Sequence, residues 1–459
     1  MLGWDDEMKN NMTNDMTKGN PVKLILLFSI PLLIGNVFQQ FYSMVDTIIV
    51  GRFVGVDALA AVGATGSMVF LVNGFVTGLT SGFAVLVSQK FGAKDEDGLR
   101  KAVASAVTLT VISVIVVTLV SLIGAKPLLN LMNTPENIMA DAHTYIKIIY
   151  GGIIATVAYN LIASILRALG DSKTPLYFLI VASILNVILD LVFIINFKMG
   201  VAGAAYATII SQGVSAILCL VYTYKKFIIL RLKKEDFNVK RKYYHKHLNI
   251  GIPMALQFSI TAIGIMTVQG ALNVFGSIVI ASYTAASKAL QLVMQPAITF
   301  GVTMATYCGQ NLGAKEYGRI KEGVKECTKI SIITSIIAGA VLVFLGKYFV
   351  MMFISNPDAE ILRYAQQVLD ISAIFFIPLG LIFIYRNALQ GIGDSFVPMM
   401  AGAYELIARA IVAFTLPSQL KFMGICLADP IAWLAAVIPL GITYFKRIKS
   451  LLRHGNIKA

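Results

Sequence analysis

Long apolar stretches constrain this chain more than any other feature of its sequence. A helix needs about 20 residues to cross the roughly 30 Å of hydrocarbon in a bilayer, and apolar runs of that length recur along the whole chain. Only 14% of the 459 residues are charged, whereas soluble domains carry about 25%. The runs do not alternate strictly between apolar and polar residues, as the strands of a β-barrel would. We therefore predict an all-α membrane protein.

Charged, proline-marked and glycine-marked breaks divide the apolar sequence into twelve predicted membrane helices. Their approximate ranges are 23–50, 58–88, 100–124, 143–166, 175–196, 202–224, 248–275, 280–308, 326–346, 362–388, 396–416 and 425–445. Segment 1–22 precedes them and lacks the basic start and short apolar core of a secretory signal. It is predicted to be a cytoplasmic N-terminal segment, so that the first membrane helix acts as the insertion signal.

Basic residues gather in alternate loops. Segment 225–247 holds nine Lys/Arg against two acids, and the tail 446–459 holds five Lys/Arg and no acid. Because basic loops stay in the cytoplasm, both termini, the linker 225–247 and the tail are expected on the cytoplasmic side of a cell membrane. The net charge of +14 then reflects topology and attraction to anionic membrane lipids, not nucleic-acid binding.

Cysteine and histidine spacing gives no metal-binding pattern. Cys219, Cys308, Cys327 and Cys426 read as small apolar residues rather than disulfides or metal ligands. His245 and His247 stand in a run of lysines, which favours a solvated linker over a metal site. No metal and no cofactor is expected, and we expect a monomer.

The two halves of the chain repeat each other. Four anchors pair at offsets of 222, 221, 222 and 223 residues: Ser29-Ile30-Pro31 with Gly251-Ile252-Pro253, QKFGAK from Gln89 with QNLGAK from Gln310, Pro135-Glu136 with Pro357-Asp358, and Gly170-Asp171-Ser172 with Gly393-Asp394-Ser395. Each half holds an even number of predicted helices, so the copies share one orientation. The chain is predicted to form two pseudo-symmetric six-helix bundles, an N-lobe 23–224 and a C-lobe 248–445. Such a plan suits alternating access.

Two acids lie inside predicted membrane helices, where an ionisable side chain is costly and indicates function. Asp46 is late in its helix, and Asp190 lies at a similar predicted depth. Asn186 shares a helix face with Asp190 because the two are four residues apart. Burial and a second carboxyl nearby both disfavour ionisation. The pocket could therefore exchange a proton or form a Na⁺ cage, and residue types alone leave both open. The opposing interpretation is that these acids only bond neighbouring helices.

The motifs, in order and duplicated, resemble the MATE (multidrug and toxic compound extrusion) family over roughly residues 18–445. They are Lys18-Gly19-Asn20-Pro21, Pro31, Gln39-Gln40, Val45-Asp46, Gly51-Arg52, the QxxGA segments, the GDSxxP turns, Asn186–Asp190 and Gly200–Ala205. This resemblance implies a central cavity and export of mostly cationic organic compounds, driven by inward flow of H⁺ or Na⁺. It also implies that Asp46, Asp190, Asn186 and Thr208 bind the coupling cation, with Asn160 and Tyr145 as further members.

Other polar residues are candidates for the cavity or for gating. On the first helix they are Pro31, Asn36, Gln39 and Gln40. Pro31 is either a kink that responds to protonation, one idea that the resemblance to this family suggests, or a bend for lobe packing, which the repeated Pro253 favours.

In the second half, the predicted helix 248–275 carries no carboxylate, which puts a cation site there in doubt. Lys288 and Asp370 are placed at similar depth and are hypothesised to pair. Glu405 and Arg409 form an i, i+4 pair, which we expect to stabilise the bundle more than to touch substrate.

Three other functions fit the sequence less well. A lipid-linked oligosaccharide flippase of the same superfamily would keep the fold, but two acids favour cationic cargo. An intramembrane enzyme needs a nucleophile–base or metal constellation, and none is found; His143 stands alone at a helix entrance. A passive channel fits the duplicated two-lobe plan poorly.

Overall fold

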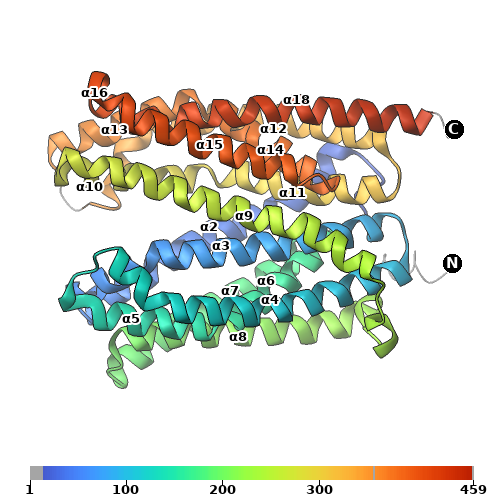
Figure 1. Cartoon of the computed structure of the whole chain (residues 1–459), viewed down its shortest axis with the longest axis horizontal. Coiled ribbons are helices and arrows are strands. Elements are labelled where there is room, and N and C mark those ends of the chain that lie inside the picture. Colours follow the sequence, from blue (N-terminus) through green and yellow to red (C-terminus); the bar gives the residue numbers. More distant parts are fainter. Residues whose placement is uncertain (1–13, 355–356, 457–459) are drawn as a thin grey trace. The chain divides into compact units, whose positions relative to one another are not determined.

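The computed structural model describes residues 14–354 and 357–456, and in this part of the chain every regular element is a helix (Figure 1). The first half holds α2 (Pro21–Phe53), α3 (Val56–Gly92), α4 (Glu96–Leu131), α5 (Glu136–Gly151), α6 (Ile153–Ala168), α7 (Lys173–Leu191) with the π-helical turn η1 (Val192–Asn196), and α8 (Gly200–Lys226). The 3₁₀ turns η2 (Ile228–Leu230) and η3 (Lys234–Phe237) follow. The second half holds α9 (Arg241–Leu272), η4 (Asn273–Phe275), α10 (Ser277–Val293), α11 (Gln295–Gly313), α12 (Tyr317–Met351), α13 (Ala359–Ile374), α14 (Phe376–Gly391), α15 (Phe396–Thr415), α16 (Pro417–Leu420), α17 (Phe422–Cys426) and α18 (Ala428–Asn456).

The predicted spans are confirmed, but three of them are broken. Within the described residues nine helices are long and apolar enough to cross a bilayer, and three bent pairs raise the number to twelve. The pairs are α5 with α6, α10 with α11 and α13 with α14, bent by 45°, 44° and 55°. The first break falls at Gly151-Gly152, and the second precedes Pro296. Glycine and proline are the usual causes of such bends, and the sequence reasoning treated these spans as continuous.

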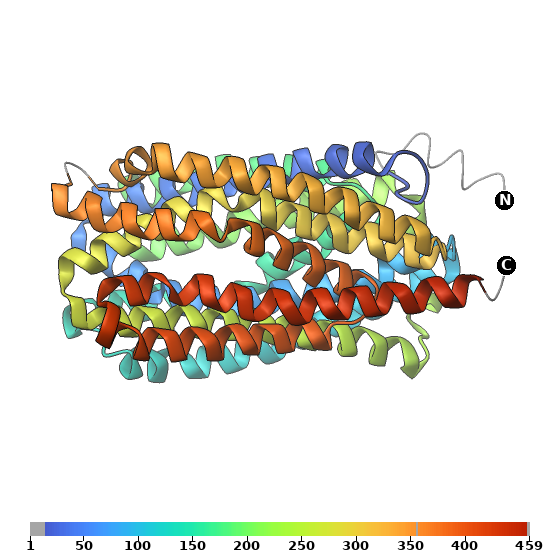
Figure 2. The same ribbon diagram turned by 90° about the horizontal axis from the view of Figure 1, so that it is seen from above.

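The chain packs as two compact units. Unit 1 holds the described residues up to Asp15 together with Ile30–Ala255, and unit 2 holds Met16–Ser29 together with the described residues after Ala255. Within each unit the long helices run along a common direction (Figures 1 and 2). The leading helices α2 and α9 are therefore each divided: the first part of α2 belongs to unit 2 and the first part of α9 to unit 1. This differs from the expected lobes 23–224 and 248–445.

Proline lies at both divisions. Pro31 and Pro253 are inside α2 and α9, each two residues from the residue at which the helix changes unit. A proline interrupts the backbone hydrogen bonding of a helix interior, so both helices are weakened where they pass between units. Both helices continue through these prolines, and the two expected roles of Pro31 stay predictions.

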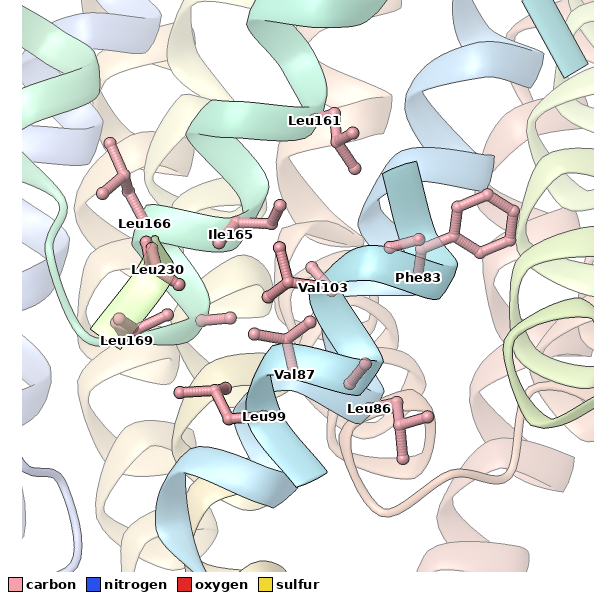
Figure 3. Packing of buried hydrophobic residues seen from close by; sticks show 14 of the residues in the cluster. Phe83, Leu86, Val87, Leu99, Val103, Leu161, Ile165, Leu166, Leu169 and Leu230 are labelled. Atoms are coloured by element: carbon pink, nitrogen blue, oxygen red, sulfur yellow. The ribbon is translucent and has the colours of Figure 1, made fainter. Parts of the chain in front are cut away.

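The segment between α8 and α9 contributes to the core of unit 1. Phe227 and Leu230 are buried and belong to the same apolar cluster as Phe83, Leu99 and Leu166 (Figure 3). The basic linker 225–247 is therefore packed in part, with Phe227 and Leu230 buried while its lysines and arginines stay exposed.

His247 corrects the expectation of a solvated linker histidine. It is fully buried, and its Nε2 lies 3.0 Å from the carbonyl oxygen of Ala102. Its ring stands edge-on to Phe83, with centroids 5.5 Å apart. The four cysteines are buried and free, as expected for small apolar residues.

Candidate ion-coupling site

The two predicted membrane acids meet in unit 1. Asp46 is in the second half of α2 and Asp190 is in the last turn of α7, and their carboxyl groups lie within hydrogen-bonding reach of each other. Asp190 is fully buried and Asp46 is half-buried. The structure therefore brings together two carboxyls that are 144 residues apart in sequence (190 minus 46).

Asn186 positions one of these carboxyls. With its amide oriented so that both polar atoms are satisfied, the Asn186 nitrogen donates to Asp190 Oδ2 at 2.9 Å and its oxygen accepts from the backbone N–H of Thr208 at 3.1 Å. The Thr208 hydroxyl donates to the carbonyl of Ala204 at 3.0 Å. Asn186 thus connects α7 to α8 and fixes the orientation of Asp190.

Tyr42 is a member that the sequence reasoning missed. It lies four residues before Asp46, on the same face of α2, and its hydroxyl hydrogen-bonds to the Thr208 side chain. Tyr145 of α5 is buried beside Asp46 and Asp190, so the structure places this expected residue at the pocket. The i, i+4 spacing from Asp46 was the available signal for Tyr42.

Each carboxyl keeps one oxygen without a donor. Asp46 Oδ1 and Asp190 Oδ1 are buried and have no hydrogen-bond partner among the described residues. No lysine, arginine or histidine in the described ranges lies within 4.0 Å of either carboxyl. A buried carboxylate without a counter-charge is costly. The pair therefore favours uptake of one cation, either a proton shared between the carboxyls or a Na⁺ held by their oxygens.

The remaining N-terminal candidates are placed as follows. Asn160 of α6 donates to Thr77 Oγ1 of α3 at 3.3 Å. Gln39 is exposed, and Gln40 and Asn36 are half-buried. Their expected role in a cavity or a gate stays a prediction.

Glu405 and Arg409 on α15 do not form the expected direct ion pair. Glu405 instead accepts a hydrogen bond from Arg386 of α14, and Arg409 Nε donates to Asp429 Oδ1 of α18 at 2.7 Å. The hydroxyl of Tyr283 donates to the other oxygen of Asp429 at 3.1 Å. Residues on one helix can reach neighbouring helices as easily as each other, and helix spacing does not reveal those neighbours.

The hypothesised pair of Lys288 with Asp370 does not form either. Lys288 is exposed on α10, whereas Asp370 accepts a hydrogen bond from Gln366 at 2.7 Å within α13. Similar depth was a poor guide because it does not specify which way a side chain points around its helix.

These features define a class of protein. The described residues form membrane-spanning helices and contain no group of three metal-ligating side chains. The fold and site are those of a multi-pass membrane protein with a buried pair of carboxyls.

Comparison with known proteins specifies the family. The MatE family model matches twice, at residues 31–192 and 250–415. The chain therefore belongs to the MATE family of multidrug efflux transporters, and each half matches the family pattern, as the internal repeat predicted.

Relatives and solved structures agree with this assignment. The chain is 32% identical over 383 residues to "Probable multidrug resistance protein YpnP" of Bacillus subtilis, covering 83% of this chain and 84% of the relative. It is 22% identical over 414 residues to the "FAD transporter" of Shewanella oneidensis, covering 89% and 91%. A multidrug resistance MATE family transporter in an outward-facing conformation matches the fold with a TM-score of 0.90 at 22% identity, over 95% of this chain and 98% of the other.

Proposed function

We propose that this chain exports cationic, lipophilic organic compounds in exchange for H⁺ or Na⁺, with Asp46 and Asp190 as the site of the coupling ion. The observation that supports this proposal is the buried carboxyl pair with an unpartnered oxygen on each member. Binding or release of one small cation changes the net charge of the carboxyl pair. That change can bias the equilibrium between two conformations.

The distribution of basic residues supports a cell-membrane location with cytoplasmic termini. The export direction is supported by the relatives described as multidrug resistance proteins. The substrate class follows from the acidic character of the site in unit 1 and from the printed descriptions of relatives as multidrug resistance proteins. No nucleic-acid partner and no cofactor belong to the proposal, and we propose that the chain works as a monomer.

Transport in proteoliposomes tests this function. Ethidium export is measured with a pH gradient and a Na⁺ gradient imposed separately, for the wild type, Asp46→Asn and a control, Asp57→Asn. Asp57 is exposed at the start of α3, so its loss removes an acid of unit 1 outside the pocket.

We expect one of the two gradients to drive export in the wild type and in Asp57→Asn, and Asp46→Asn to reduce it at least about tenfold, as loss of a residue that binds the driving ion requires. Unchanged gradient-driven export in Asp46→Asn would refute the ion site. Flavin export without ethidium export would refute the cationic substrate class while leaving the ion site intact.

A further inference from the structure

A groove lies between α5 and α8 in unit 1, apart from the carboxyl pair. Its volume is about 690 Å³, and its lining comes from α5, the adjoining Gly152 and α8. The groove involves the second half of α5 and the first three turns of α8 (Figure 1).

One end of the groove is basic. His143 and Lys147 are one turn apart on α5 and therefore share a face, and Tyr206 of α8 lines the groove with them. Lys147 is exposed and His143 is half-buried, and neither has an ion pair among the described residues. The groove thus offers an uncompensated ammonium together with an imidazole and a phenol. Such donors bind phosphate or another oxyanion.

The other end is apolar and is kept open by glycine. Ile148 and Ile209 line it together with Gly151 and Gly152, where α5 bends into α6 by 45°. A Cβ at Gly152 would overlap the side chain of Ile209, so glycine is needed there for α8 to approach. A Cβ at Gly151 would meet no atom within 4 Å, so this position faces the open groove.

If the start of α5 marks the water-facing edge of the bilayer, helix length places the groove across the boundary between headgroups and hydrocarbon. Lys147 lies eleven residues after the first residue of α5, or about 16 Å along the helix axis at 1.5 Å per residue. Headgroup regions add only about 5–8 Å to each side of the hydrocarbon. A lysine at this depth extends its ammonium toward the interface, while Ile148 and Ile209 remain level with acyl chains.

An anionic head beside an apolar tail fits both ends. We propose that this groove binds an anionic phospholipid, with the phosphate at His143, Lys147 and Tyr206 and one acyl chain against Ile148 and Ile209. A free phosphate would use the basic end alone, and a cationic drug is disfavoured by Lys147. The site is separate from the proposed ion-coupling site, so either assignment can fail without the other.

Lipid titration of the purified protein tests the site. The midpoint of thermal unfolding is followed in detergent as phosphatidylglycerol, phosphatidylcholine or inorganic phosphate is added. We expect a saturable rise with phosphatidylglycerol only. Lys147→Gln should weaken the apparent affinity about fivefold, since one basic residue near a membrane surface contributes about that factor toward anionic lipid.

Matched variants separate charge from shape. Gly151→Leu keeps both basic residues and fills the apolar end, and it should also weaken the lipid response. Lys147→Arg should retain the response. Lys126→Gln removes an exposed lysine of α4 outside the groove and should leave the response unchanged. An undiminished phosphatidylglycerol response in both Lys147→Gln and Gly151→Leu would overturn the proposal, and so would an equal rise with inorganic phosphate alone.

Discussion

Unit 1 and unit 2 descend from the same sequence pattern but bury charge in opposite ways. In unit 1, Asp46 and Asp190 face each other, and no basic residue in the described part of the chain lies within ion-pairing distance of them. In unit 2, the buried Glu405 pairs with Arg386 and the half-buried Asp429 pairs with Arg409. The duplication therefore preserved the helical scaffold and not the chemistry within it.

The carboxyl pair of unit 1 can change its charge by binding a cation, whereas the ion pairs of unit 2 cannot easily do so. Paired opposite charges stabilise each other's ionised forms, whereas two facing carboxyls favour binding of a cation. We infer that unit 1 carries the ion-dependent step and that the network of unit 2 holds α14, α15 and α18 together.

The two units also differ in how their leading helices, α2 and α9, pack against a neighbouring helix. In unit 1, Gly251 of α9 packs on α3, where its Cα would lie 2.5 Å from a Cβ placed at Gly82. In unit 2, the matching residue of α2 is Ser29, whose hydroxyl lies 2.8 Å from that of Thr303 in α11. The contact of α9 with α3 depends on close backbone approach, whereas the contact of α2 with α11 includes a side-chain hydrogen bond.

The largest expected effect is on transport, when an acid of unit 1 is removed and an acid of unit 2 serves as the comparison. Asp190→Asn should reduce gradient-driven ethidium export at least about tenfold, because the remaining carboxyl no longer has an acidic partner for the coupling ion. Asp370→Asn, which alters a half-buried acid of unit 2 bonded to Gln366, should keep export within about threefold of the wild type, as expected outside a coupling site. Export rates in proteoliposomes check both. An equal loss in the two variants would assign ion coupling to unit 2 as well.

The next effect is on stability. Arg386→Met should lower the free energy of unfolding by about 3–5 kcal/mol, since it leaves Glu405 buried without its partner. The double variant Arg386→Met with Glu405→Met should recover most of that loss, because no unpaired charge remains. Thermal unfolding of the purified variants measures the difference. A double variant as unstable as the single one would show that the pair matters for its packing and not for its charge.

The smallest effect distinguishes the two GDS turns. Asp171 is fully buried before α7, and its Oδ1 accepts from the backbone N–H groups of Lys173 and Thr174, both at 3.0 Å. Burial raises the pKa of Asp171, although these hydrogen bonds act against the shift. The corresponding Asp394 instead pairs with Arg447 at 2.8 Å.

A raised pKa in the folded state means that Asp171 favours folding less as the pH rises above the unfolded value of about 3.9. Asp171→Asn keeps the acceptor oxygen and should raise stability at neutral pH by up to about 1 kcal/mol, with the gain vanishing in acid. Asp394→Asn should instead cost about 0.2–1 kcal/mol, since a partly exposed ion pair is lost. Unfolding midpoints at two pH values test the opposite signs.

The sequence by itself determined the membrane class, the twelve spans, the repeat and the similar depth of Asp46 and Asp190. Each of these follows from local hydrophobicity, register or the high cost of a membrane carboxylate. Asn186 was found because it lies one helical turn from Asp190, and the same rule would have found Tyr42.

Only the tertiary structure decided which helices face each other. It replaced the Glu405–Arg409 pair by partners on α14 and α18, separated Lys288 from Asp370, buried His247 and divided α2 and α9 between the two units. A one-dimensional pattern records the depth of a side chain and its face on its own helix. The neighbour across that face depends on packing among all the helices, and no local pattern contains that information.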